Sequence, residues 1–280
     1  MPSARLGFVQ YLNTLPLVEG LGTWREVELV PAVPAKLSGL LRAGSIDVGL
    51  CSLVDAAATD PAAEPLTLVP AGMIGCDGPT LTVRLFSAVP LERVTVLHAD
   101  TESHTSVVLA QILLRQRFGA RPTVRDFDAT AHTAHTAPGT PATPHWPETL
   151  LIIGDKVVTD PPPADRYPHQ LDLGEAWHAW TGLPFVYGMW MCRSVDAAST
   201  RVAVIAEMLE RQRLRNTLRL DWLVDRYAST RGWPADLARR YVGEYLRYAV
   251  GPRERAAVTR FFAEAASLGT LPATQPRWLN

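Results

Sequence analysis

The chain has 280 residues, 47% of them hydrophobic and 20% charged, which suits a globular protein with one large or two medium domains. The formal net charge of −1 excludes a general basic field that would gather nucleic acid or an anionic membrane surface. No apolar run approaches about 20 residues, and the beginning MPSARLGFVQ lacks the layout of a secretory signal, so we expect a cytoplasmic protein that does not span a membrane.

Short strands and helices alternate over the first ninety residues. The apolar run 5–10 predicts a strand, and a helix is expected over 14–20 because Pro16 suits a first helical turn. Four further strands and one helix follow from alternating or amphipathic apolar positions. They are a strand within 24–33, a helix from 34 to Gly44, a strand at 46–50, and strands at 66–74 and 80–89.

The same alternation restarts with a strand at 94–100, a polar break at 101–106 and a helix at 107–118. The apolar segment 149–155 is typical of a central parallel strand, and 185–192 predicts another strand. The remainder has helical periodicity, with helices expected near 197–219, 236–248 and 253–267.

This order of elements predicts an α/β fold with mostly parallel, covered sheets, built as two lobes with a cleft between them. Ligands of open α/β sheets bind beyond the carboxyl ends of the strands, near helix N-termini. Five strand ends carry small or polar residues that are candidates for such a site. They are Asn13-Thr14, Cys51-Ser52, the strand with Thr80 and Thr82, Ser103 to Ser106, and Gly154-Asp155.

Each of these polar residues also has a structural interpretation. Asn13 or Thr14 is a candidate N-cap ahead of Pro16, and Ser103, Thr105 and Ser106 are candidate caps of the helix that follows them. Capping does not require a hydroxyl or amide at every strand end, whereas a cleft that binds a carboxylate benefits from such donors. The combined pattern therefore favours a ligand site.

Cysteine, histidine and aromatic residues indicate no metal site or disulfide. The three cysteines are far apart and form no CxxC pair, so buried free thiols are expected, at Cys51, Cys76 and Cys192. The segment with His132, His135 and His145 is rich in Ala, Thr and Pro, which favours a surface loop over a metal site. Core positions are expected for the aromatic residues Trp177, Trp180, Tyr187 and Trp190.

No GxSxG, HExxH, GxGxxG, Walker or kinase motif occurs, which leaves a binding protein or an enzyme without a cofactor. At this point the sequence resembles the chorismate dehydratases of the futalosine route to menaquinone. The stretch Tyr11 to Leu17, YLNTLPL, is similar to their YLNT-x-PL signature. Further matching segments follow in the same order, namely GSIDVG from 44, GPTLTVRLFS from 78, ESHTS from 102, IGD from 153, and DLGEAW with TGLPFVY from 172 to 187.

The resemblance implies a type II periplasmic-binding-protein fold, with one lobe of residues 1–88 plus 194–280 and a second of 89–193. It implies conversion of chorismate, a dicarboxylate, to 3-[(1-carboxyvinyl)oxy]benzoate and water, without metal or other cofactor. Asn13 would lie closest to the chemistry. The carboxylates would be held by Ser52, Thr82, Ser103, Thr105, Ser106 and the backbone around Gly154, while Asp155 would bind the departing hydroxyl or only brace its strand.

The sequence departs from the family pattern at His104, where arginine or another polar residue is common, and at Thr80 and Thr82, near places where a small aliphatic residue and serine are expected. Asparagine is no credible general base, so a water or a carboxylate of the substrate would accept the proton. Two alternatives stay open. One is the sister enzyme that forms 1,4-dihydroxy-6-naphthoate, which has an Asn-Asp pair in place of YLNT, and the other is a non-catalytic protein that binds a small carboxylate.

Overall fold

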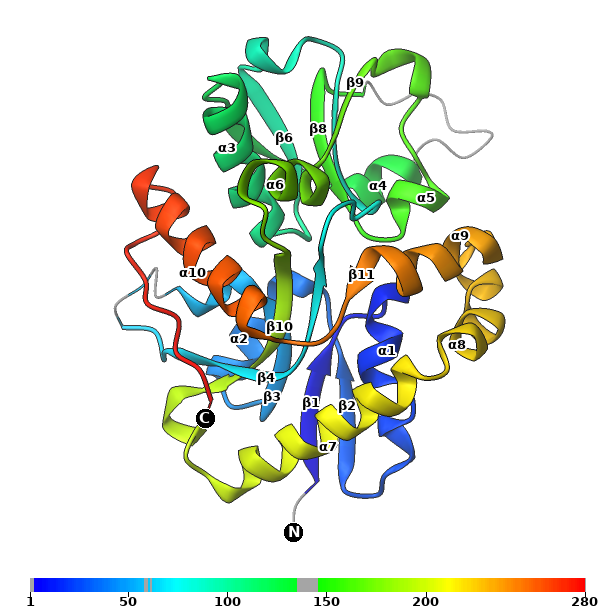
Figure 1. The fold of residues 1–280 in the computed structure, drawn as a ribbon, viewed down its shortest axis with the longest axis vertical. Helices are drawn as coiled ribbons and strands as arrows, with labels where there is room; N and C mark the ends of the chain where they lie inside the picture. Colours follow the sequence, from blue (N-terminus) through cyan, green and yellow to red (C-terminus); the bar gives the residue numbers. More distant parts are fainter. Residues whose placement is uncertain (1–2, 58–59, 61, 135–145, 280) are drawn as a thin grey trace.

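Two β-sheets, one above the other in Figure 1, organise the chain in this computed structural model, which describes residues 3–57, 60, 62–134 and 146–279. The first sheet has the order β11-β4-β10-β3-β1-β2, and the second β7-β6-β8-β5-β9. The strands of the first are β1 (Ala4–Phe8), β2 (Val27–Pro31), β3 (Val48–Ser52), β4 (Leu66–Cys76), β10 (Phe185–Arg193) and β11 (Leu246–Arg247). The second contains β5 (Val83–Ser87), β6 (Val96–Asp100), β7 (Thr123–Phe127), β8 (Thr149–Ile153) and β9 (His169–Asp172).

Both sheets are mixed, so the expectation of mostly parallel sheets is wrong. β1 runs parallel to β2 and β3, and β6 runs parallel to β7 and β8, as the strand-helix alternation predicts. β10, by contrast, is antiparallel to β3 and β4, and β5 is antiparallel to β8 and β9. The chain passes from β4 into β5 in the other sheet with no helix between them, and it returns through β10 after α6, so β5 and β10 run against their neighbours.

The long strands β4 and β10 link the two sheets, and they run side by side in Figure 1. The division of the chain into two lobes remains a proposal. Strand pairing favours boundaries slightly different from residues 88 and 194, because β5 pairs only with second-sheet strands and β10 only with first-sheet strands.

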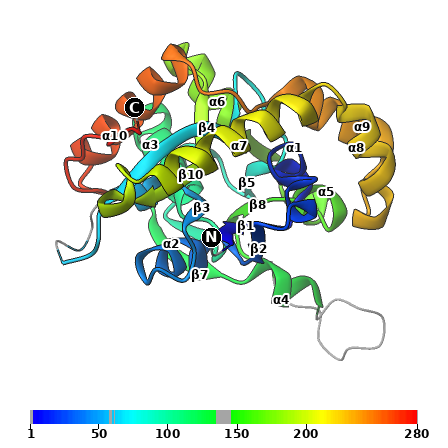
Figure 2. The same cartoon turned by 90° about the horizontal axis from the view of Figure 1, so that it is seen from below.

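Helices cover both sheets (Figure 2). α2 packs on β3, α7 packs on α1 and β4, and α3 contacts α6 and β8. The described helices are α1 (Leu15–Val18), α2 (Pro34–Arg42), α3 (Thr105–Phe118), α4 (Ala129–Ala134), α5 (Lys156–Thr159), α6 (Leu173–Thr181), α7 (Thr200–Thr217), α8 (Leu220–Tyr227), α9 (Ala235–Arg240) and α10 (Pro252–Ser267). The helix expected over 236–248 is interrupted, because α9 passes into a π-helical turn, Tyr241–Tyr245, and then into β11.

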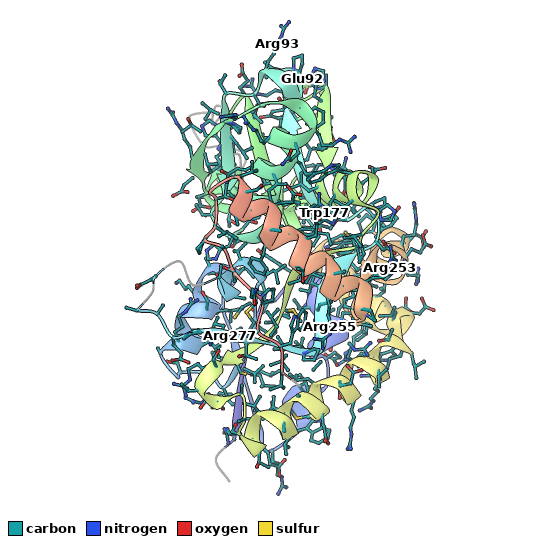
Figure 3. All side chains as sticks on the ribbon, turned by 60° about the vertical axis from the view of Figure 1, so that its left-hand side comes forward. Glu92, Arg93, Trp177, Arg253, Arg255 and Arg277 are labelled. Atoms are coloured by element: carbon teal, nitrogen blue, oxygen red, sulfur yellow. The ribbon has the colours of Figure 1, made fainter. Side chains whose placement is uncertain are left out.

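The C-terminal helix α10 holds the region of the two linking strands together (Figure 3). It contacts β10 and α3, and its Phe261 ring lies 6.4 Å from the ring of Trp177 in α6. At its beginning, the Arg253 guanidinium contacts the Asp77 carboxylate at 2.6 Å. This helix therefore binds elements that belong to both sheets.

The expected core aromatics and thiols are largely confirmed. Trp177 and Trp190 are fully buried, Trp180 is half-buried, and the three cysteines are free and buried. His132 lies in α4 rather than in a loop, with its ring 4.2 Å from that of Trp146, while His135 and His145 lie outside the described residues. In the described part of the chain, no helix has the length and apolar character needed to cross a bilayer.

Candidate functional site

A cavity lies where the carboxyl ends of β1, β3, β6 and β8 approach the two linking strands. Its volume is about 650 Å³, counted with its opening to solvent. Seven of the eight site residues expected from the sequence line it: Asn13, Ser52, Thr82, Ser103, Thr105, Ser106 and Gly154. The eighth, Asp155, is not part of the lining.

The rest of the lining is apolar or carries neutral hydrogen-bonding groups, with one exception, Glu102. Its apolar members are Val9, Pro34, Leu50, Ile74, Val83, Ile153 and Leu246, and its further polar or aromatic members include Tyr11, Thr80, Tyr187 and Tyr241. Apolar walls with a few placed donors suit a ring that carries polar substituents.

The capping interpretation of the strand-end residues is wrong. Thr14 Oγ1 donates to the carbonyl oxygens of Val9 and Tyr11, at 2.7 and 2.8 Å, so it satisfies acceptors rather than helix N–H groups. The residue before α3 is His104, which makes no side-chain cap, and Thr105 Oγ1 accepts from the Val54 N–H at 3.3 Å. The first N–H groups of α3 therefore have no side-chain cap and are left available to an anion.

Asn13 is held by one of its two polar atoms. Its Nδ2 donates to the Tyr241 hydroxyl at 3.2 Å, and that hydroxyl also lies 2.6 Å from Thr82 Oγ1. The Asn13 side chain is buried, and its Oδ1 has no hydrogen-bond partner among the described residues. A buried acceptor without a partner is unfavourable, so a ligand that donates a hydrogen bond would be favoured here.

A second tyrosine contacts the site from β10. The Tyr187 hydroxyl lies 2.7 Å from Thr80 Oγ1, so Tyr187 belongs to the cavity as well as to the core. The Thr80 segment is fixed by Asp172, the N-cap of α6, whose carboxylate accepts from the N–H groups of Thr80 and Leu81. These bonds explain how a segment with Leu81 at φ +71° stays ordered.

Glu102 shares a neighbouring cation, Lys156, with Asp100. Lys156 Nζ contacts the carboxylates of Glu102 at 2.6 Å and Asp100 at 2.9 Å, and the Tyr11 hydroxyl donates to Glu102. Burial opposes the charge of Lys156, but the two carboxylates outweigh it and raise the lysine pKa. Burial raises the pKa of Asp100 and of the Tyr11 phenol. Glu102 therefore faces the cavity as one of two carboxylates that are paired with a single lysine.

Two further contacts join the sheets beside the cavity. The Leu12 N–H donates to Asp155 Oδ2 at 3.1 Å, and His104 Nδ1 lies 3.0 Å from Asp55 Oδ1. Burial raises the Asp155 pKa to about 6, and the bond from Leu12 opposes that rise only in part. The hydrogen bond to Asp55 is the main reason why the His104 pKa is raised. Asp155 thus contacts the backbone next to Asn13 instead of the cavity.

Four polar residues of the lining had not been expected at the site from the sequence. Tyr11 and Glu102 occur inside the quoted motifs, and Tyr187 was expected only in the core, so attention to motif neighbours could have found them. Tyr241 lies in a segment predicted as ordinary helix, where no local pattern marks it. No cluster of metal-ligating side chains occurs within the described residues.

Comparison with known proteins agrees with this geometry. A family model described as menaquinone biosynthesis matches residues 4–267. The chain is also 27% identical to the chorismate dehydratase of Thermus thermophilus, over 97% of this chain and 98% of that protein.

Solved structures confirm the periplasmic-binding-protein fold. The alkanesulfonate-binding protein SsuA of Xanthomonas axonopodis pv. citri, bound to MOPS, superposes with a TM-score of 0.64 at 14% identity, covering 100% of this chain and 96% of SsuA. A Candida albicans protein described as having the generic periplasmic binding protein fold gives a TM-score of 0.65 at 10% identity, covering 98% of this chain and 92% of that one. At such identities the likeness concerns the fold alone.

Proposed function

Because this chain belongs to the menaquinone biosynthesis family, we propose that it is a chorismate dehydratase, which converts chorismate to 3-[(1-carboxyvinyl)oxy]benzoate and water. The observation that carries the proposal is one cavity that gathers Asn13 of the YLNT motif with the hydroxyl residues of three other candidate positions, namely Ser52, Thr82 and the group Ser103, Thr105 and Ser106. The similarity to the Thermus enzyme extends over nearly the whole chain and supports the same activity. The reaction would be the first step of the futalosine route, in the cytoplasm.

Chorismate carries two carboxylates on and beside a six-membered ring, and the cavity offers neutral donors for them. The uncapped N-terminus of the 14-residue helix α3 supplies backbone N–H groups and a positive dipole end, with Ser103 and Ser106 beside it. Ser52 and Thr82 supply further hydroxyls from other elements of the lining. Apolar residues such as Leu50 and Ile74 would contact the ring.

The reaction breaks the C3–H and C4–O bonds and leaves an aromatic ring. The electron pair of the C–H bond enters the ring, and the hydroxyl leaves C4 with its bonding pair and becomes water when it takes a proton. Aromatisation drives this elimination, so we propose a hydro-lyase that needs no redox or electrophilic cofactor. The protein's tasks are to orient the hydroxyl and to stabilise charge that develops on the ring carboxylate.

Asn13 would orient the C4 hydroxyl, since its buried Oδ1 is a hydrogen-bond acceptor without a partner among the described residues. Glu102 is the one carboxylate among the described residues of the lining, and its Oε2 already accepts hydrogen bonds from Tyr11 and Lys156. This favours a water or a substrate carboxylate as proton acceptor.

Incubation of the purified protein with chorismate tests the proposal. We expect loss of one water and the appearance of the enol-ether benzoate, followed by mass spectrometry and by the aromatic absorbance. Chorismate that is bound but recovered unchanged would favour a carboxylate-binding protein. Chorismate that is neither bound nor consumed would favour the naphthoate-forming sister enzyme, which acts on a later intermediate.

A further inference from the structure

Tyr241 lies at the wall of the cavity in an unusual backbone conformation. It begins the π-helical turn Tyr241–Tyr245, is fully buried, and stacks on the Trp233 ring with centroids 4.8 Å apart and planes 12° from parallel. π-helical turns are rare and occur often at functional sites. The stacking fixes the ring, and therefore the position of its hydroxyl.

The Tyr241 hydroxyl determines which group donates and which accepts in the hydrogen bonds that join Asn13, Tyr241 and Thr82. The Asn13 amide nitrogen can only donate, so the Tyr241 oxygen accepts at 3.2 Å. The single phenol proton is then available to Thr82 Oγ1 at 2.6 Å, which leaves the Thr82 proton free to turn toward the cavity. Burial raises the pKa of Tyr241, which keeps that proton in place.

The Asn13 amide could also be turned by about 180°, and its NH₂ group would then face the ligand in place of its oxygen. With Nδ2 on Tyr241, the group left without a partner among the described residues is the acceptor Oδ1. The site therefore presents one acceptor, at Asn13, and one donor, at Thr82. An alcohol next to an anionic or ether oxygen matches this pair.

We propose that Tyr241 is a positioning residue that turns the Asn13 oxygen and the Thr82 proton toward the substrate. The inference rests on the proposed dehydratase activity and extends it: Asn13 Oδ1 accepts from the C4 hydroxyl, and Thr82 donates to a carboxylate or ether oxygen. The benzoate product lacks the C4 hydroxyl and leaves Asn13 Oδ1 without its donor, which would favour product release.

The substitution Tyr241→Phe keeps the ring and its stacking but removes the hydroxyl. We expect kcat to fall at least tenfold, because the Asn13 amide is then free to rotate, while the product dissociation constant measured by calorimetry changes less than threefold. The matched control is Tyr248→Phe, because Tyr248 is buried in the same hydrophobic cluster and its hydroxyl has no hydrogen-bond partner among the described residues. The control should keep kcat within twofold.

A Tyr241→Phe protein that keeps kcat within twofold, or that loses no more than the Tyr248→Phe control, overturns the inference. Wild-type protein that leaves chorismate unchanged overturns the proposed function and this inference with it. If the wild type is active, the comparison of Tyr241→Phe with wild type tests the role of Tyr241 alone. If Tyr241→Phe fails to fold by circular dichroism, Thr82→Val breaks the same chain from its other end. We then expect kcat of Thr82→Val to be about tenfold below wild type and kcat of Thr82→Ser to be close to wild type. A Thr82→Val protein with unchanged kcat contradicts the inference.

Discussion

The backbone N–H of Leu12 donates a hydrogen bond to the Asp155 carboxylate at 3.1 Å, which joins the segment after β1 to the end of β8. Leu12 begins the short helical turn η1 (Leu12–Thr14), Asp155 directly precedes α5, and both adjoin residues that line the cavity. The position of Asn13 relative to Gly154 thus depends on a half-buried carboxylate that the sequence suggested only as a binding group or a brace.

We expect the stability of the wild-type protein to fall with rising pH because of Asp155, and we expect the variant Asp155→Asn to lack this dependence. Its pKa is raised from 3.8 to about 6 in the folded protein, so folding retains a proton and stability falls as pH rises through that interval. We expect the unfolding free energy of Asp155→Asn, relative to wild type, to be higher at about pH 8 than at about pH 4, by up to roughly 3 kcal/mol.

Urea unfolding at the two pH values measures this difference. Asp160→Asn serves as the control, because Asp160 is exposed and follows α5 directly. An Asp155→Asn protein whose stability relative to wild type is the same at both pH values would show that ionisation of the half-buried Asp155 carboxylate does not destabilise the fold.

His104 and Asp55 predict a loss of stability in the same direction as for Asp155, as pH rises, but at a higher pH. Asp55 raises the His104 pKa above 6.5, so the ion pair contributes fully below that pH and is lost as pH rises through the folded value. We expect His104→Gln to melt below wild type at about pH 6 and to approach it at about pH 9. Because His104 is partly exposed, the effect should shrink in high salt. Equal melting differences at the two pH values would contradict the pairing.

Gly154 is expected to resist substitution for two separate reasons. Its φ is +75°, and a Cβ added there would lie 3.1 Å from carbons of the Tyr11 ring. Gly119 is the matched control, with φ +69° and no atom within 4 Å of an added Cβ. We expect Gly119→Ala to lose about 1 kcal/mol of unfolding free energy from the backbone alone, and Gly154→Ala to lose more. Equal losses would show that the Tyr11 ring moves aside freely.

Asn13→Ala should abolish turnover of chorismate and leave the melting temperature close to that of wild type. Among the described residues the Asn13 amide makes one side-chain hydrogen bond, to Tyr241, so its removal costs about 1 kcal/mol of stability. Steady-state kinetics and circular dichroism measure the two effects, and exposed Gln10→Ala is the control from the same segment. Full activity in Asn13→Ala would remove this residue from the mechanism.

Local patterns predicted most elements of the fold correctly, because apolar periodicity reflects which face of an element is buried. The helix over 107–118 and the strand at 149–155 correspond to α3 and β8, with ends shifted by a few residues. The strands β7 and β9 and the helices α6 and α8 were not predicted. β7 is half-exposed and edge-placed, and β9 has only four residues, so neither has a strong pattern.

The amino-acid sequence by itself determined that five polar strand ends exist and that they resemble one enzyme family, since both facts follow from the order of residues. Only the tertiary structure decided what these residues do. A hydroxyl before a helix is equally able to cap it or to face a ligand, and the choice depends on partners distant in the chain, such as Val54 for Thr105. Tyr241 is the clearest case, because its contact with Asn13 spans 228 positions and no local pattern encodes it.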